Sequence, residues 1–330
     1  MPSADYDVLC VGILVADLFV PPLPRLPLPG ELQLVDDMLL STGGCAANTA
    51  MDLARLGARV AVAGKVGNDF FAGFVRRELA AKGVDATGIR QSATAPTAST
   101  VILPVIGQDR RYIHAVGANA ELRVADVDLD QVARSRVLYV GGYLLFPGFE
   151  PAGLAGLFHF AQEQGIQTVL DVAGPKAEQG LEALAPVLPL TDVFLPNQDE
   201  AAIMTGESDA WRQSEILLEC GAKTIVITRG AEGAIVRTRQ AAFSAAALPI
   251  DFIDGSGAGD AFDAGYIVGL LDGWDIERTI AFASAVGASA CTRLGTTPGV
   301  FTRAEALDFL TRHPLTLARP KTREAHHANA

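Results

Sequence analysis

The sequence lacks the features that mark several large classes of protein. Its cysteines are far apart and form no C-x-x-C pair, so neither a zinc site nor a redox motif is indicated: Cys10, Cys45, Cys220 and Cys291. No apolar run reaches about 18 residues without Gly, Pro or a charge, which argues against a membrane-spanning helix. The first residues include Asp5 and Asp7, where a secretory leader is basic. We therefore expect a cytoplasmic protein with reduced thiols and no membrane partner.

Positive charge is scarce as well. The 330 residues include 38 acidic and 26 basic side chains, which gives a net charge of −12. A nucleic-acid surface needs a basic patch, and so does an anionic membrane, so neither partner is expected. Hydrophobic residues make up 49% of the chain, which is enough for a large core, and a small molecule becomes the default ligand.

Two familiar nucleotide-binding signatures are missing or incomplete. No G-x-x-x-x-G-K-[ST] occurs, so a P-loop enzyme is not indicated. Residues 255–259 superficially resemble a dinucleotide-binding fingerprint, but they lie late in the chain and the last glycine spacing is wrong. An NAD-dependent dehydrogenase is therefore disfavoured.

What the chain does have is a glycine-rich turn that leads into a helix pattern. Residues 254–260 read Asp-Gly-Ser-Gly-Ala-Gly-Asp, and the apolar residues of 261–271 then recur at the spacing of one helix face. The first amides of such a helix have no intrahelical partner, and the helix dipole adds partial positive charge, so the turn suits a phosphate-like anion. Asp260 stands beside this anion pocket, where a carboxylate can accept a proton from an attacking hydroxyl. The alternative is a plain carboxylate in a first helical turn.

Strand and helix patterns alternate along most of the chain. Strands are expected near 8–15, 59–64, 137–140, 168–171, 193–195, 224–228 and from 234, and helices near 51–56, 70–79, 151–164, 198–205, 209–220, 261–271 and 279–291. This alternation is typical of a parallel sheet with crossover helices. Residues 316–330 are polar and basic without periodicity, so we expect a frayed tail in which His326 and His327 are solvated.

Two segments break the alternation. Residues 97–121 contain two β-rich runs joined by Gly107, Gln108 and Asp109, which predicts a hairpin. This hairpin forms either a lid over a ligand site or an edge of the main sheet. Residues 20–30 are rich in proline, which excludes a helix or a central strand, so this segment either links two elements or borders a ligand site.

Six separated motifs together indicate a family. They are a glycine pair followed by an asparagine at Gly43, Gly44 and Asn48, G-x-V-G-x-D at 64–69, G-A-N-A at 117–120, N-x-x-E at 197–200, T-x-G-x-x-G at 228–233 and D-x-x-G-A-G-D at 254–260. Over residues 7–300 their order resembles that of the ribokinase-like (phosphofructokinase-B type) carbohydrate kinases. One match alone is weak, whereas six in order are specific.

The resemblance implies a fold and a domain organisation. The fold is α/β, with three α/β/α layers, a mostly parallel central sheet and a small β-sheet lid. Residues 1–315 would form a single kinase domain, with the lid made from about 13–38 and 97–121 and the nucleotide-binding half at about 190–300.

The resemblance also implies roles for residues on the substrate side. Asp260 would be the base that contacts the acceptor hydroxyl, and the amides of Gly257, Ala258 and Gly259 would form the anion hole. The positions that hold sugar hydroxyls in the family correspond to Asp17, Gly43, Gly44 and Asn48. Asn119 would either reach the sugar from the lid or simply form a turn.

On the nucleotide side, the matching positions are Asn197, Thr228, Gly230 and Gly233. Glu200 would organise Mg²⁺ through water, as suits an ion that dehydrates reluctantly. A helix cap with a first-turn glutamate explains Asn197 and Glu200 equally well. The loop of Asp254 and Ser256 is a candidate K⁺ site, so ATP, Mg²⁺ and, through that loop, K⁺ are the implied cofactors.

The sequence departs from the family pattern at two places. Gly255 stands where threonine is usual, and residues 141–146 lack the acidic residue that ribokinase proper places near ribose, so ribose is not supported as the substrate. Arg110 and Arg111 in the lid either pair with a carboxylate or phosphate of the substrate or remain solvated and protect a strand edge. We favour the second role.

These observations predict an ATP-dependent sugar kinase that transfers the γ-phosphate to a hydroxyl of a monosaccharide or sugar acid. Closure of the lid would keep water from attacking the phosphate. A nucleoside kinase of the same family and a non-catalytic sugar or nucleotide sensor on the same scaffold are the alternatives. The exposed strand edges of the lid predict a homodimer through the lid.

Overall fold

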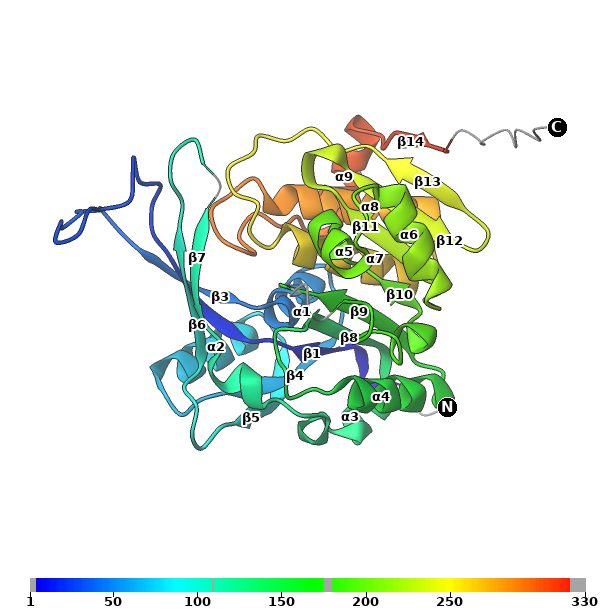
Figure 1. The fold of residues 1–330 in the computed structure, drawn as a ribbon, viewed down its shortest axis with the longest axis horizontal. Coiled ribbons are helices and arrows are strands. Elements are labelled where there is room, and N and C mark those ends of the chain that lie inside the picture. The colour runs from blue at the N-terminus through cyan, green and yellow to red at the C-terminus, as the bar shows by residue number, and fades with distance from the viewer. Residues whose placement is uncertain (1–3, 109, 175–179, 321–330) are drawn as a thin grey trace.

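An apolar run, Val8 to Val11, forms the centre of strand β1 (Tyr6–Gly12) and is buried from both sides. Strand β1 lies inside a ten-stranded sheet (Figure 1). In spatial order the strands are β14 (Leu317–Ala318), β13 (Ala242–Ala245), β12 (Ala234–Thr238), β11 (Thr224–Thr228), β10 (Val193–Phe194), β9 (Gln167–Val172), β8 (Ser135–Tyr143), β1, β4 (Val60–Val66) and β5 (Asp85–Gln91). The computed structural model describes residues 4–108, 110–174 and 180–320.

The sheet is parallel from β5 to β11 and antiparallel from β11 to β14, so the expected mostly parallel sheet is confirmed. The chain passes from β1 outward to β4 and β5 and then returns to β8 on the other side of β1. At such a reversal, open α/β sheets leave a crevice at the carboxyl ends of the strands, where ligands bind.

Alternate residues of each strand face two separate hydrophobic cores. In β1, Val8 and Cys10 belong to one core and Leu9 and Val11 to the other. The first core includes helices α1 (Cys45–Arg55), α2 (Phe70–Ala81), α7 (Ala258–Leu271), α8 (Ile276–Ala290) and α9 (Arg303–Arg312), and the second includes α3 (Leu129–Ala133), α4 (Pro151–Glu163), α5 (Gln198–Thr205) and α6 (Ala210–Glu219). The expected three-layer α/β/α arrangement is therefore confirmed.

A second, smaller sheet stands beside the first, with the strand order β3 (Leu39–Gly43), β2 (Val15–Phe19), β6 (Ala98–Leu103) and β7 (Arg111–Ala115). Strands β6 and β7 form the expected antiparallel hairpin, and it belongs to this sheet rather than to the edge of the main sheet. Strand β3 extends the second sheet beyond the expected range of 13–38. Its apolar run before the glycine pair is too short to give a strand pattern.

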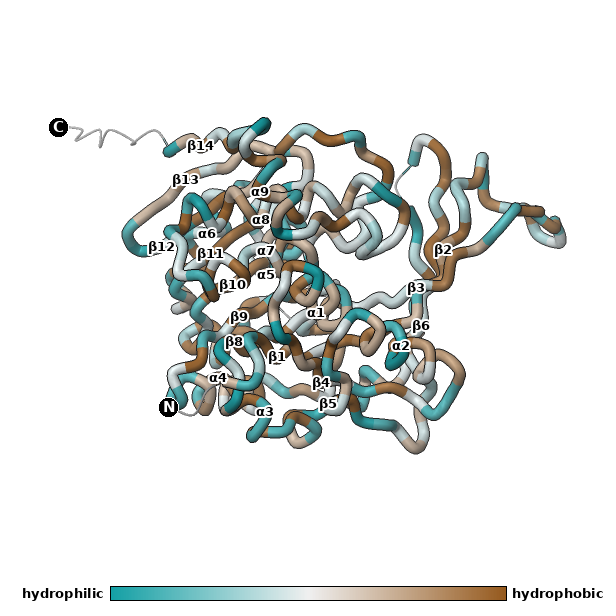
Figure 2. The backbone as a smooth tube through the Cα atoms, turned by 180° about the vertical axis from the view of Figure 1, so that it is seen from behind, coloured by the Kyte–Doolittle hydropathy of each residue, from teal (hydrophilic) through white to brown (hydrophobic). Residues whose placement is uncertain are grey.

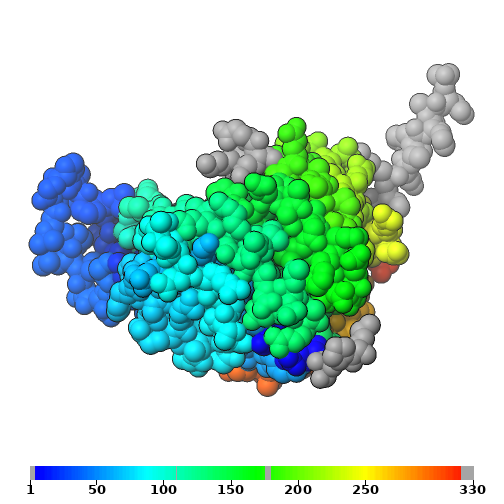
Figure 3. Space-filling model, turned by 90° about the horizontal axis from the view of Figure 1, so that it is seen from below, coloured from blue at the N-terminus to red at the C-terminus, as the bar shows by residue number. Residues whose placement is uncertain are grey.

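The proline-rich segment between β2 and β3 projects from the body as an arm, which we define as residues 20–38. It stands clear of the rest of the molecule in both the ribbon and the space-filling view (Figures 1 and 3). Leu23 at its base is buried, but the leucines farther along it are exposed, so hydrophobic stretches mark the arm in Figure 2. The prolines account for its extended course, since they cannot donate to a sheet ladder or continue a helix.

The chain end differs from the expected frayed tail over 316–330. Strand β14 pairs with β13 in antiparallel register, so the chain remains ordered through residue 318 at the edge of the sheet. His326 and His327 lie outside the described residues. In the described part of the chain, no helix combines the length and apolar character that a membrane crossing requires.

Candidate active site

The carboxyl ends of strands β1, β8 and β9 lie side by side at the chain reversal. Gly12 ends β1 with a φ of 148°, and a Cβ there would lie 2.1 Å from the carbonyl oxygen of Gly141. At the end of β9, the Oδ2 atom of Asp171 accepts a hydrogen bond of 2.9 Å from the amide of Gly142. The strand ends are therefore closely packed, and Ala46 near the start of helix α1 lies beside them.

The part of the site that the family resemblance assigns to the acceptor, the acceptor side, contains Asp17 of strand β2, which is 7% exposed. A Cβ at Gly43 would lie 1.9 Å from the Oδ2 atom of Asp17, so this glycine makes room for the carboxylate. Gly44 has a φ of 90°, and a Cβ there would lie 2.4 Å from the carbonyl oxygen of Ile13. Burial raises the pKa of Asp17 to about 6, against the effect of a hydrogen bond from Thr100.

Asn48 joins the acceptor side to the helix that follows the glycine-rich turn. Its Nδ2 atom donates a hydrogen bond of 2.8 Å to the Oδ2 atom of Asp260. The next residue, Thr49, places its Oγ1 atom 3.3 Å from the carbonyl oxygen of Asp260. The Oδ1 atom of Asn48 is buried and has no hydrogen-bond partner within the described ranges. A ligand hydroxyl could satisfy this atom, since buried polar atoms normally have partners.

Asn119 does not present its amide to the acceptor side. Its Nδ2 atom donates to the carbonyl of Leu14, at 3.1 Å, and its Oδ1 atom accepts from the amide of the same residue, at 3.2 Å. The side chain therefore ties the short helix Gly117–Glu121 to the link between β1 and β2. This long-range tie differs from both expected roles, since the side chain is bonded to Leu14 and does not form a local turn.

The part of the site that the family resemblance assigns to the phosphate, the phosphate side, is the N-terminus of α7. Gly257 precedes the helix with a φ of 74°, and a Cβ there would lie 2.3 Å from the carbonyl oxygen of Thr296. Ala258, Gly259 and Asp260 form the first turn, where backbone amides have no intrahelical partners, although the amide of Ala258 donates to the carbonyl oxygen of Gly255 at 3.3 Å. The expected helix start within the glycine cluster is confirmed, and its geometry suits an anion.

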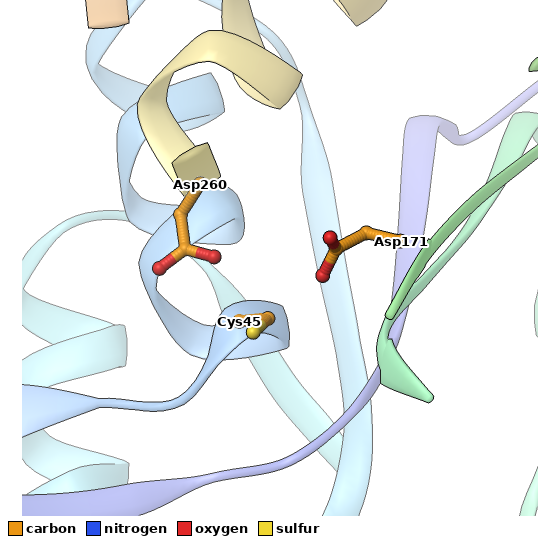
Figure 4. Close-up of side chains that lie close together, drawn as sticks. All are labelled: Cys45, Asp171 and Asp260. Carbon is orange, nitrogen blue, oxygen red and sulfur yellow. The ribbon is translucent and has the colours of Figure 1, made fainter. Parts of the chain in front are cut away.

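Two residues that the sequence motifs did not single out lie beside Asp260. Ligand atoms of Cys45, Asp171 and Asp260 all lie within 4.8 Å of one another, and Figure 4 shows their side chains converging from α1, β9 and α7. Burial raises the pKa of Asp260, while hydrogen bonds from Asn48 and Cys45 oppose that shift. The pKa of Asp171 is raised well above its usual range by burial and by the charges of Glu200 and Asp260. The sequence signal for Asp171 was a carboxylate at the end of a buried strand.

The part of the site that the family resemblance assigns to the nucleotide, the nucleotide side, is formed by two loops that meet at the end of β11. Asn197 and Glu200 make a reciprocal capping box at the start of α5, with both hydrogen bonds at 2.9 Å. Asn197 also pairs with Thr228 in a parallel bridge. Gly233 has a φ of 84°, and a Cβ there would lie 1.9 Å from the carbonyl oxygen of Ala245. Gly230 likewise has a positive φ, so both glycines of the motif allow the tight turn.

The charge of Glu200 depends strongly on its surroundings. Burial raises its pKa to about 7, hydrogen bonds from Asn197 lower it, and the charge of Asp260 raises it again. Carboxylate oxygens are the ligands that Mg²⁺ prefers, and a nearby divalent cation would favour the ionised form. The donor set of Glu200 and Asp171 therefore fits a hydrated Mg²⁺, whereas the thiol of Cys45 does not.

The loop of Asp254 and Ser256 is closed by its own hydrogen bonds. The Oδ1 atom of Asp254 accepts from the Oγ atom of Ser256 at 3.0 Å, and its Oδ2 atom accepts from the amide of Gly295 at 3.2 Å.

The two lid arginines, Arg110 and Arg111, make different contacts. An Nη1 atom of Arg110 lies 3.6 Å from the Oδ1 atom of Asp254, whereas Arg111 donates to Gln108 on the hairpin.

The fold and the site together define the class of protein, an α/β enzyme with an anion-binding helix N-terminus facing a lid. The model of the pfkB family carbohydrate kinases matches residues 5–303. The chain therefore belongs to the pfkB family of carbohydrate kinases, which confirms the family resemblance and makes the protein a kinase of carbohydrates.

Individual relatives differ in what they act on. The chain is 29% identical over 294 residues to a ribokinase of Haemophilus influenzae, which covers 87% of this chain and 93% of the relative. It is 27% identical over 262 residues to a 5-dehydro-2-deoxygluconokinase of Clostridium perfringens, covering 74% and 77%. The structure of a putative ribokinase II from E. coli in complex with ATP and Mg²⁺ shares the fold with a TM-score of 0.79, at 24% identity over 93% of this chain and all of that one.

The raised pKa of Asp17 predicts a pH dependence of acceptor binding. Because this pKa is about 6, the carboxyl is ionised at neutral pH and becomes protonated as the pH falls below that value. The acceptor dissociation constant should then rise by roughly tenfold per pH unit, since a protonated carboxyl loses its charge-assisted hydrogen bonds to hydroxyls. Calorimetric titration without ATP, between about pH 5 and about pH 8, measures this constant.

The matched variant is Asp17→Asn, which has the same shape and does not titrate. This variant should bind the acceptor weakly at every pH, and its dissociation constant should lose most of its dependence on pH. A dissociation constant of the parent protein that stays the same at both ends of the range would contradict the role assigned to Asp17.

Proposed function

We propose that the protein is an ATP-dependent sugar kinase that transfers the γ-phosphate to a hydroxyl of a monosaccharide or sugar acid, with Asp260 as the base. The observation that carries this proposal is the hydrogen bond from Asn48 to Asp260. It joins the helix on the acceptor side to the helix whose N-terminus suits a phosphate. An acceptor hydroxyl held near Asn48 thus lies within reach of both the base and the anion pocket.

Asp260 accepts the proton late in the reaction. Phosphoryl transfer passes through a loose transition state, so little proton transfer is needed before the bond to phosphorus forms. The raised pKa of the buried carboxylate strengthens it as a proton acceptor at that stage. Positioning and charge stabilisation carry most of the rate, and the amides of Gly257, Ala258 and Gly259 face the charge that develops on the phosphoryl group.

The nucleotide binds along Asn197, Thr228, Gly230 and Gly233, whose turns leave backbone close to the end of β11. Mg²⁺, bound with ATP, would supply charge neutralisation of the phosphates, and Glu200 and Asp171 would hold its water ligands. A K⁺ site at Asp254 and Ser256 stays a prediction. Both carboxylate oxygens of Asp254 already accept hydrogen bonds from the protein.

A nucleoside kinase is the second candidate, and one cavity favours it. This cavity of about 260 Å³ lies between the lid and the loop before α7 and is mostly apolar: Phe19, Pro22, Ile102, Pro104, Arg110, Ile253, Asp254 and Leu294. Phe19 lies on the same face of β2 as Asp17, so an acceptor held by Asp17 could place an apolar group there. A non-catalytic sensor is disfavoured, because it needs neither a base nor a metal organiser.

A substrate panel tests the proposal and separates the candidates. ADP formation in a coupled assay should depend on a sugar or sugar acid, with ribose and 5-dehydro-2-deoxygluconate included because relatives act on them. Dependence on nucleosides in preference to free sugars would favour the second candidate. Stabilisation by sugars with a nonhydrolysable ATP analogue, but no turnover of any acceptor, would contradict the kinase proposal and favour a sensor.

A homodimer through the lid follows from two exposed features. Strand β7 is at the edge of the lid sheet and is exposed along its whole length, with Ile113 64% exposed. On the arm, Leu32 and Leu34 are 82% and 78% exposed. An unpaired edge strand is a template for pairing, and a second copy offers the same edge with two-fold symmetry. Burial of the arm leucines would stabilise such a pair.

Sedimentation equilibrium tests the dimer. The parent protein should have twice the mass of one chain at micromolar concentration, and replacing Leu32 and Leu34 by Asp should yield a monomer because the interface would bury two charges. Leu307→Asp on α9, away from the lid, is the control and should remain a dimer. A monomeric parent protein would refute the lid interface.

A further inference from the structure

Arg110 connects the lid to the loop that precedes the anion-binding helix. It stands directly before strand β7, while Asp254 lies on the main domain at the start of the glycine-rich turn. The Nη1 atom of Arg110 is 3.6 Å from the Oδ1 atom of Asp254, and the two side chains are 25% and 7% exposed. The guanidinium is also held within the lid, because it donates to the hydroxyl of Tyr112. The side chain of Arg110 thus links the lid to the main domain and is not a solvated charge.

Gly255 explains how the guanidinium fits there. A Cβ at this position would lie 3.3 Å from the Nη1 atom of Arg110 and 3.6 Å from its Nη2 atom. A threonine adds further atoms to that Cβ, so the guanidinium would have to move away. Gly255, the position at which the motif departs from the family pattern, therefore faces Arg110 of the lid.

Asp254 is linked to both loops that shape the anion pocket. Its Oδ1 atom accepts hydrogen bonds from the amide and the hydroxyl of Ser256, and its Oδ2 atom accepts one from the amide of Gly295. The adjoining Thr296 in turn packs against Gly257. A carboxylate in this place fixes the loops, but its negative charge opposes a phosphate bound at the first turn of α7. A guanidinium beside it offsets that charge.

We propose that Arg110 is a positioning residue that couples closure of the lid to the phosphate side of the site, and that Gly255 is the space it requires. With the lid closed, Arg110 lies against Asp254, holds residues 254–259 in place and offsets the negative charge next to the anion pocket. With the lid open, the negative charge of Asp254 is no longer offset, and residues 254–259 are no longer held in place. The inference rests on the proposed kinase function, because the anion is taken to be the transferred phosphoryl group.

The test compares Arg110→Met with Arg111→Met, which removes the same charge from the neighbouring position. Arg110→Met should lower kcat by about tenfold to a hundredfold and raise the ratio of acceptor-independent ATP hydrolysis to transfer, while the KM for ATP changes little. Arg110→Lys should recover part of the lost kcat, and Arg111→Met should behave like the parent. A kcat for Arg110→Met within twofold of Arg111→Met would overturn the proposal.

The role of Gly255 is tested by a double-mutant cycle. Gly255→Thr should lower kcat about as much as Arg110→Met does. The kcat of the double variant should be no lower than that of the poorer single variant, because both changes remove the same contact between Arg110 and Asp254. Additive losses would show that the two residues act separately and would overturn the proposed coupling.

A readout without turnover keeps this proposal separate from the kinase proposal. Hydrogen–deuterium exchange should become faster in Arg110→Met, compared with Arg111→Met, both in the lid hairpin and at residues 254–259. Unchanged exchange at 254–259 would overturn the coupling even in an active enzyme. Faster exchange in a protein that phosphorylates no acceptor would uphold the coupling and contradict the kinase function.

Discussion

The hydrogen bond between Asn48 and Asp260 is the contact on which the site depends. Asn48 lies on α1, the helix that begins after Gly43 and Gly44, whereas Asp260 lies in the first turn of α7, more than two hundred residues later. The bond holds the acceptor side against the phosphate side. It also orients one carboxylate oxygen of Asp260. Thr49 supports the same contact, because its Oγ1 atom lies 3.3 Å from the backbone carbonyl oxygen of Asp260.

Negative charge gathered around this contact has an energetic cost. Besides burial, the charges of Asp260 and Glu200 raise the pKa values of Asp171 and of Asp263, which lies on α7, and the charge of Asp260 also raises the pKa of Glu200. Such a cluster stabilises nothing by itself, since like charges repel in a medium of low dielectric constant. Cations that arrive with the substrate would offset the repulsion, which supports the proposed binding of a metal–nucleotide complex. In the same way, Arg110 offsets Asp254 at the edge of the site.

Local sequence patterns predicted the parts of the structure that depend on local chemistry. The apolar run of β11 and the glycine cluster before α7 have patterns that few other conformations satisfy. Asp171 and Cys45 were missed because their proximity to Asp260 arises from the packing of α1, β9 and α7, which no short segment encodes. For the same reason, the role of Asn119 on the link between β1 and β2 could be recognised only in the folded chain.

The central claim is that Asp260 accepts the proton of the acceptor hydroxyl, and a single-turnover experiment with Asp260→Asn tests it most directly. The asparagine keeps the size of the side chain and its contact with Asn48 but cannot act as a base. With ATP and acceptor binding checked by calorimetry, phosphoryl transfer should be slower than in the parent protein by about a hundredfold to ten-thousandfold. Transfer within tenfold of the parent rate, with both ligands bound, would contradict the claim.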